Sequence, residues 1–201
     1  HSFPTRRSSD LIVEEVGSGV TDLKPGDHVV ASLTPACGNC LFCLERKPFM
    51  CVEMGKVIWQ GCLPDGTTRL KNAKGQAIGQ LVGVGTFSER AVIPAGNAIK
   101  VDHNAPLDTV CLIGCGVTTG VGAALNTVKI NPGDSCAVIG CGGVGLSIIQ
   151  GARIAGATMI IAIDPVPQKR ELALKLGATH AIDPKAVNPV KEVRALARGG
   201  V

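Results

Sequence analysis

The second half of the chain is built around one run of eight residues: Val138-Ile139-Gly140-Cys141-Gly142-Gly143-Val144-Gly145. It joins the end of an apolar segment to the spacing G-x-G-x-x-G. In this spacing Gly140 permits a tight turn, and Gly142 lets the backbone approach a pyrophosphate. The third glycine, Gly145, lets a following helix pack closely on the preceding strand. The run therefore predicts a strand, a phosphate-binding turn and the start of a helix.

The residues that flank this run complete half of a dinucleotide-binding unit. We expect a helix over residues 146–155 and a second apolar strand over 159–163, which ends on Asp164. The free N–H groups and positive dipole end of the helix would face the pyrophosphate. The carboxylate of Asp164 can accept hydrogen bonds from an adenosine ribose and repels a 2′-phosphate, which favours NAD over NADP. The spacing alone can be a mere glycine turn, but the two strands and the acid favour dinucleotide binding.

After Asp164 the chain continues to alternate between helix and strand. We predict a helix over residues 168–176, a third strand over 178–182 and a further helix that begins after Asn188. This order indicates an α/β fold with a doubly wound parallel sheet. The chain stops at Val201, two strand–helix units short of a complete sheet, and we expect it to be truncated there.

Composition restricts the class of protein. The 201 residues include 26 Gly but only four Phe, one Trp and no Tyr, and no apolar run is long enough to span a membrane. The formal net charge of +4 comes from scattered basic residues, so we expect no nucleic-acid partner. Nine Cys without a secretory signal indicate a reducing, cytoplasmic location, where clustered thiols are more often metal ligands than disulfides.

Residues 1–11 differ in character from the rest of the chain, because they are polar, basic and without periodicity. They could be a flexible tail. We favour another interpretation: the string resembles the translation of a common sequencing adapter, so we exclude it from the fold. On this interpretation the natural protein begins upstream and its start is missing here.

Residues 12–104 form the first expected domain. Short apolar segments alternate with turn signals, and residues 28–31 and 87–93 have the composition of strands. We expect a small, twisted, partly open barrel. A connecting helical region would follow over 105–132, with a helix ending near Val128, and the nucleotide domain would occupy 133–201.

Four cysteines in the first domain have the spacing of a metal site, C-x2-C-x2-C-x7-C: Cys37, Cys40, Cys43 and Cys51. One loop can wrap four thiolates around a tetrahedral ion, and a closed four-sulfur site is typical of structural zinc. An iron–sulfur cluster of the bacterial ferredoxin type would need a final C-x3-C-P, which is absent. Unrelated buried thiols remain the other alternative.

Several single residues carry weaker signals. Trp59 is expected to pack, and the isolated His28 and His103 are expected to be ordinary surface or hydrogen-bonded residues. Cys115 stands between glycines at the start of the expected helix. On spacing alone it is a buried small residue rather than a metal ligand.

The ordered motifs of the chain resemble those of the zinc-containing, medium-chain alcohol dehydrogenases. From residue 12 onward, the first domain is similar to their GroES-like catalytic domain and the rest to their NAD-binding Rossmann domain. The resemblance is strongest to the class III branch, the glutathione-dependent formaldehyde dehydrogenases. Four motifs stand in the order of that branch: Pro-Asp-Gly-Thr at 64–67, Gly-Thr-Phe-Ser at 85–88, Cys-Leu-Ile-Gly-Cys-Gly at 111–116 and the glycine run at 140–145.

The resemblance implies roles for named residues. It implies that the four clustered cysteines hold structural zinc and that Cys115 is one ligand of a catalytic zinc. Thr119 and Val144 look like the residues that press on the nicotinamide ring, and Asp164 and Lys169 like the pair on the adenosine ribose. The glycine run would bind the dinucleotide through Gly140, Gly142, Gly143, Val144 and Gly145. The family gives Cys141 no role.

The resemblance also implies what is missing. The first catalytic cysteine of the family, its Gly-His-Glu motif and its proton relay would lie upstream of residue 12, so we expect the 201-residue chain itself to be inactive. We expect its parent to transfer hydride between NAD and an alcohol or a hydroxymethyl-thiol adduct, as a homodimer or homotetramer. A non-catalytic NAD-binding relative is the alternative, although such a protein has no need of a thiolate at Cys115.

Overall fold

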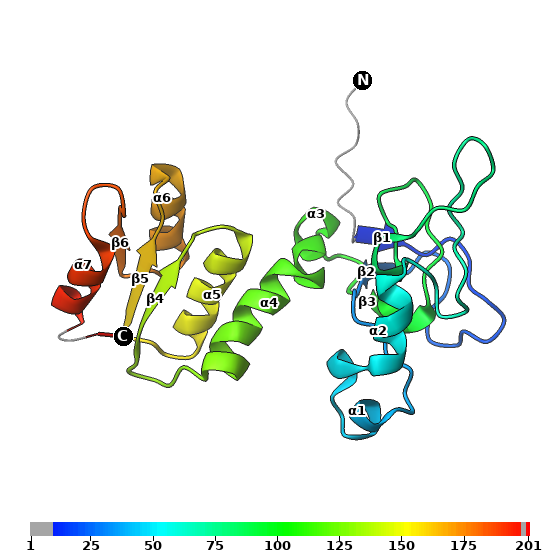
Figure 1. Ribbon diagram of the computed structural model, residues 1–201, viewed down its shortest axis with the longest axis horizontal. Coiled ribbons are helices and arrows are strands. Elements are labelled where there is room, and N and C mark those ends of the chain that lie inside the picture. The colour runs from blue at the N-terminus through cyan, green and yellow to red at the C-terminus, as the bar shows by residue number, and fades with distance from the viewer. Residues whose placement is uncertain (1–9, 198–199) are drawn as a thin grey trace. The chain divides into compact units, whose positions relative to one another are not determined.

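A computed structural model describes residues 10–197 and 200–201, which form two compact units, His1–Gly114 and Cys115–Val201 (Figure 1). Residues 1–9 of the expected tail lie outside the described residues. Asp10 and Leu11 belong to a strand that pairs with Val29 and Val30, so the prediction that these two residues lie outside the fold is wrong. The division between the units falls inside the region 105–132, which we expect to connect the two domains.

The first unit contains a three-stranded antiparallel sheet in the order β1-β2-β3. Its strands are β1 (Asp10–Ile12), β2 (His28–Ala31) and β3 (Ala98–Lys100). Three successive residues of the central strand, Val29 to Ala31, are buried, and β2 has the bounds that its β-branched composition predicts. Two short helical segments close this unit, α3 (Leu107–Val110) and η4 (Cys111–Gly114).

A cysteine-containing segment extends from the sheet of the first unit. It comprises α1 (Leu41–Leu44), η1 (Pro48–Met50) and α2 (Val52–Trp59). The 3-10 turns η2 (Leu81–Gly83) and η3 (Ala95–Asn97) come later along the chain.

The strand predicted over residues 87–93 is wrong. The Ser88 hydroxyl donates to the carbonyl oxygens of Arg90, at 2.6 Å, and Gly85, at 3.2 Å. These local bonds turn the backbone and compete with a sheet ladder. Among the described residues of this unit, strand pairing amounts to the three-stranded sheet and an isolated bridge between Lys71 and Ala77, so the expected barrel is not closed.

The second unit is built on a parallel sheet in the order β4-β5-β6. The strands are β4 (Ser135–Ile139), β5 (Met159–Ile163) and β6 (His180–Ile182). Three helices alternate with them: α5 (Gly143–Ile154), α6 (Pro167–Leu176) and α7 (Pro189–Leu196). Before the first strand lie α4 (Gly116–Gly122) and the π-helix η5 (Ala123–Val128). The βαβ order predicted from the sequence is confirmed.

Both faces of this sheet are covered within the unit. On one face Ile149 and Ala152 of α5 and Ala173 of α6 pack against residues of β4 and β5. On the other face Val193 and Leu196 of α7 pack against the apolar side chains of β5 and β6. Because successive strand residues point to opposite faces, β5 contributes to both cores and is almost wholly apolar.

Two helix boundaries have clear local causes. Helix α5 begins at Gly143, three residues before the predicted start, because the turn made by Gly140 is completed within two residues. Helix α7 begins where predicted, since the Asn188 side chain accepts a hydrogen bond from the Lys191 N–H at 3.1 Å and Pro189 occupies the first turn.

Among the described residues, no single helix is long and apolar enough to cross a membrane. The consecutive helical segments Leu107–Gly114 and Gly116–Val128 reach that length only together, with a bend between them.

Candidate functional site

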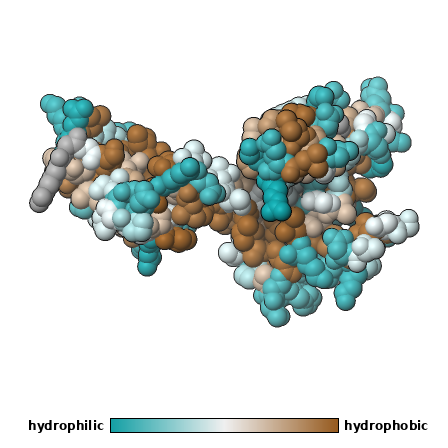
Figure 2. Space-filling view, turned by 90° about the horizontal axis from the view of Figure 1, so that it is seen from below, coloured by the Kyte–Doolittle hydropathy of each residue, from teal (hydrophilic) through white to brown (hydrophobic). Residues whose placement is uncertain are grey.

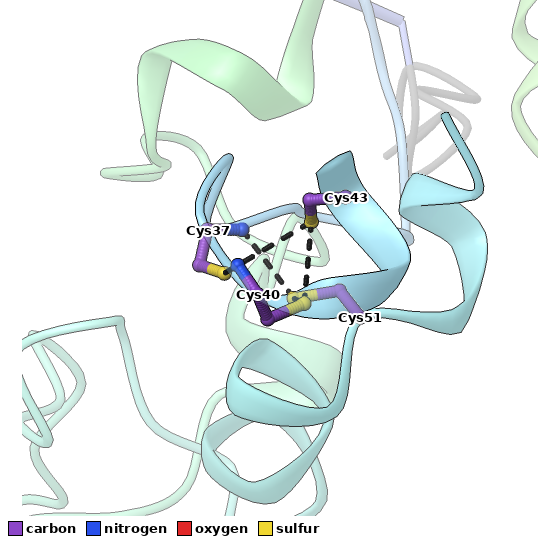
Figure 3. Close-up of side chains that lie close together, drawn as sticks. All are labelled: Cys37, Cys40, Cys43 and Cys51. Carbon is purple, nitrogen blue, oxygen red and sulfur yellow. Dashed lines mark hydrogen bonds between the residues drawn. The ribbon is translucent and has the colours of Figure 1, made fainter. Parts of the chain in front are cut away.

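The structure brings the four predicted cysteines of the first unit together. The Sγ atoms of Cys37, Cys40, Cys43 and Cys51 all lie within 4.8 Å of one another (Figure 3). The Cys40–Cys43 separation is 3.6 Å, and the Cys37–Cys43 and Cys40–Cys51 separations are 3.9 Å. A zinc ion with Zn–S bonds of about 2.3 Å places tetrahedral sulfur atoms about 3.8 Å apart. The four thiols therefore fit one zinc ion.

Backbone N–H groups support this arrangement. The N–H of Cys37 donates to the Cys51 Sγ at 3.4 Å, and the N–H of Cys40 donates to the Cys37 Sγ at 3.3 Å. Gly38 has a φ of 80°, a left-handed conformation that lets the chain bend between the first two ligands. The bonds stabilise negative charge on sulfur, so the loop favours thiolates.

The thiols of Cys43 and Cys51 do not ionise equally. Burial raises the pKa of Cys51, but the N–H groups of Met54 and Cys37 outweigh it, with help from neighbouring thiols, and lower that pKa to about 6. Burial also raises the pKa of Cys43, and the adjacent thiols take it to about 11. Like charges on neighbouring sulfurs oppose each other. A bound cation would offset this repulsion and favour the thiolate form of its ligands.

In the second unit, the glycine run forms an open turn between β4 and α5. Gly140 has a φ of 89°, and its N–H donates to the Ile163 carbonyl at 2.8 Å. A Cβ atom at Gly142 or Gly143 would meet no atom within 4 Å, so there is open space beside the start of α5. A Cβ atom at Gly145, by contrast, would collide with the Gly140 carbonyl oxygen. This geometry fits a pyrophosphate on the free N–H groups of the helix.

Asp164 lies directly beside this turn. It is only 4% exposed, and its two carboxylate oxygens accept hydrogen bonds from the N–H groups of Val166 and Cys141, both at 2.8 Å. These two bonds, that of Val166 first, lower its pKa, and the nearby charge of the exposed Lys169 acts in the same direction. The carboxylate is therefore ionised, as contact with a ribose requires.

Arg170 was not expected at this site. Its Nη1 donates to the Asp164 carbonyl oxygen at 2.7 Å, and its Nη2 lies 3.1 Å from the Asp183 Oδ2. The sequence shows a cation six residues after Asp164. It does not show that β6 pairs beside β5, which brings Asp183 close to Asp164 and Arg170.

The structure places the other predicted residues around the start of α4 and α5. Cys115 is exposed at the N-terminal end of α4, so the expectation from spacing alone, that it is a buried small residue, is wrong. Its carbonyl accepts from the Thr119 N–H at 2.9 Å. Val144 is 41% exposed in the first turn of α5. The two helices pack closely, because a Cβ atom at Gly120 would lie 2.5 Å from the Val144 carbonyl oxygen. Thr119 and Val144 thus lie on adjoining helices.

The remaining cysteines do not join a metal cluster. Within the part of the chain that the structure describes, the four clustered cysteines are the only group of three or more Cys, His, Asp or Glu side chains close enough to bind one ion. Cys115 is not gathered with other such ligands there. The Cys141 side chain is buried in the core against the sheet, at 1% exposure. His28 and His103, isolated in sequence, have ring centroids 4.4 Å apart, and the buried Nδ1 of His28 has no hydrogen-bond partner among the described residues. Trp59 is 85% exposed, so the expectation that it packs is wrong.

Two family descriptions match the chain. Residues 12–103 match the alcohol dehydrogenase GroES-like domain, and residues 143–201 match the zinc-binding dehydrogenase domain. Two curated relatives are S-(hydroxymethyl)glutathione dehydrogenases. The enzyme of Saccharomyces cerevisiae is 49% identical over 87% of this chain and 45% of its own length. That of Escherichia coli is 48% identical over 90% of this chain and 49% of its own length.

Solved structures agree with these matches. An alcohol dehydrogenase zinc-binding domain protein from Burkholderia ambifaria has a TM-score of 0.88 and 41% identity over 96% of this chain and 52% of its own. Benzyl alcohol dehydrogenase from Acinetobacter calcoaceticus has a TM-score of 0.82 and 34% identity over 96% of this chain and 51% of its own. The chain spans about half the length of the curated relatives it matches. It belongs to the zinc-containing medium-chain alcohol dehydrogenase family, in which it resembles the class III enzymes.

Proposed function

We propose that the protein carrying this chain is an NAD-dependent, zinc-containing alcohol dehydrogenase. It transfers hydride between NAD and an alcohol or a hydroxymethyl-thiol adduct such as S-(hydroxymethyl)glutathione. The observation that carries the proposal is the ionised Asp164 beside the open glycine turn, because this pair suits NAD and opposes a 2′-phosphate. The names of the curated relatives support the substrate class.

Two metal roles belong to this proposal. Cys37, Cys40, Cys43 and Cys51 hold a structural zinc ion, since four thiolates leave no coordination position open to substrate. Cys115 is one ligand of a catalytic zinc, supported by its exposure at the start of α4. Such an ion, when bound, supplies the Lewis acidity that lowers the pKa of an alcohol oxygen.

The residues of the second unit bind and orient the cofactor. The turn residues Gly140, Gly142, Gly143 and Gly145 present backbone N–H groups to the pyrophosphate. Asp164 accepts from the adenosine ribose while Lys169, exposed beside it, contributes positive charge. Thr119 and Val144, on adjoining helices, hold one face of the nicotinamide ring. Orientation of this kind is the contribution of the protein, whereas the hydride chemistry is that of the cofactor.

We also propose that the protein is cytoplasmic and forms a homodimer or homotetramer. All nine cysteines are free thiols, which suits a reducing compartment. Figure 2 shows apolar surface on both units. The large hydrophobic side chains of Ile139 and Ile154 are 85% and 71% exposed. Exposed apolar surface of this kind is available for contact with other protein surface. Light scattering of the purified protein would give its oligomeric state.

The proposal is tested by the formation of NADH at 340 nm. The whole protein that carries this chain is assayed with formaldehyde plus glutathione and with short alcohols, because we expect the 201-residue chain alone to be inactive. Cys115→Ala should abolish turnover without changing NADH affinity, because the thiol belongs to the metal site and not to the nucleotide site. Cys62→Ala, a thiol outside both sites, is the matched control. Turnover that survives Cys115→Ala would contradict the assignment of Cys115, and absence of NADH binding would contradict the proposed function.

A further inference from the structure

Every polar group of Asp164 is held by a neighbour. Its N–H donates to the Ile182 carbonyl at 3.3 Å, and its carbonyl accepts from Arg170 at 2.7 Å. Its carboxylate oxygens accept from Val166 and Cys141. Asp164 is therefore the junction at which the glycine turn, the end of β5, the end of β6 and the start of α6 meet.

Arg170 is the side chain that closes this junction. It lies in the first turn of α6 and bridges the strand ends, with Nη1 on the Asp164 carbonyl and Nη2 on the Asp183 carboxylate. The side chains of Arg170 and Asp183 are only 18% and 29% exposed. Asp183 is itself fixed, because its Oδ1 accepts from the Lys185 N–H at 2.9 Å. Charge-assisted hydrogen bonds that are partly screened from water are the stronger ones.

We propose that Arg170 is a positioning residue that fixes Asp164 for the adenosine ribose, and that Asp183 keeps Arg170 from attracting a 2′-phosphate. The inference rests on the proposed NAD site. A free arginine near this position accommodates the 2′-phosphate of NADP. Here the ion pair with Asp183 directs the guanidinium to the protein backbone instead. The pair therefore strengthens the preference for NAD that Asp164 sets, although neither side chain needs to touch the cofactor.

The test is a double-mutant cycle between positions 170 and 164. Arg170→Met keeps the aliphatic stem but removes the charge, and Asp164→Ala removes the group that it positions. Lys175→Met, which removes an exposed cation from the same helix, is the matched control. The dissociation constants of NADH and NADPH are measured by calorimetry for each variant, with circular dichroism as a check of folding.

We expect Arg170→Met to weaken NADH binding about tenfold when Asp164 is present and by less than about twofold in the Asp164→Ala background. Asp183→Ala should tighten NADPH binding, because it releases the guanidinium. Amide hydrogen exchange of the ligand-free protein should rise at Cys141 and Val166 in Arg170→Met but not in Lys175→Met. If Arg170 only stabilised the fold and had no effect on Asp164, Arg170→Met would lower thermal stability without producing these changes in affinity and exchange.

Equal losses of NADH affinity in both backgrounds, or unchanged exchange at Cys141 and Val166, would overturn the inference and leave the proposed function intact. If the unsubstituted protein binds no NADH, the proposed function fails, and this inference fails with it.

Discussion

At the scale of single residues, the proposed function makes Asp164 the residue that favours NAD over NADP in the second unit. Hydrogen bonds from the N–H groups of Val166 and Cys141 lower its pKa, so the carboxylate stays charged as the pH falls through the usual aspartate range. We expect NADH to bind more tightly than NADPH, and the affinity for NADH to be constant from about pH 5 to 8, because no proton is taken up at Asp164 there. Asp164→Gly should lower the ratio of the NADPH to the NADH dissociation constant about tenfold or more. Calorimetry with both cofactors measures it, and equal affinity in the unsubstituted protein would contradict the assignment.

At the scale of elements, the turn between β4 and α5 depends on one close approach. A methyl group at Gly145 would meet the Gly140 carbonyl oxygen, so Gly145→Ala should force the helix away from the strand. Overpacking of this kind costs about 1–3 kcal/mol or more of the free energy of unfolding. Gly143→Ala is the matched control, because a Cβ there meets open space, and it should change stability by less than about 1 kcal/mol. Urea unfolding measures the free energy of unfolding of both variants. Equal values would show that the turn has room for a methyl group at Gly145.

Elements that depend on local sequence could be predicted, whereas those that depend on distant parts of the chain could not. The strands 28–31 and 159–163 have the predicted bounds, because β-branched runs between turn residues determine them locally. The cysteine cluster could also be predicted, since its ligands are close in sequence. The strand over 87–93 was wrong because a hydroxyl of Ser88 bonds back to its own turn. The ion pair between Arg170 and Asp183 depends on the pairing of β6 with β5, which no local sequence pattern reveals.

At the scale of the whole molecule, the two units should respond to different ligands. In the 201-residue chain itself, where Cys115 is the one proposed ligand of the catalytic zinc, we expect a single bound zinc ion, held by the four cysteines of the first unit. Its removal by a chelator should increase amide exchange in α1 and α2 while the sheet of the second unit stays protected. Cys40→Ser should reproduce this effect, whereas Cys62→Ser, outside the cluster, should retain the metal. Elemental analysis and hydrogen-exchange mass spectrometry make the measurement. Finding iron, or loss of protection in both units, would be inconsistent with the four-sulfur site as a local structural zinc centre.

The cysteine cluster has a kinetic consequence. Its ligands lie at most 14 residues apart along the chain, as the bond from Cys37 to Cys51 shows. The entropy lost on closing a loop grows only with the logarithm of its length, and a loop of this size closes in well under about a microsecond. The parallel sheet, in contrast, must bring together strands separated by a whole helix, which is intrinsically slower. During synthesis the thiol loop can therefore capture its ion before the nucleotide-binding unit has left the ribosome.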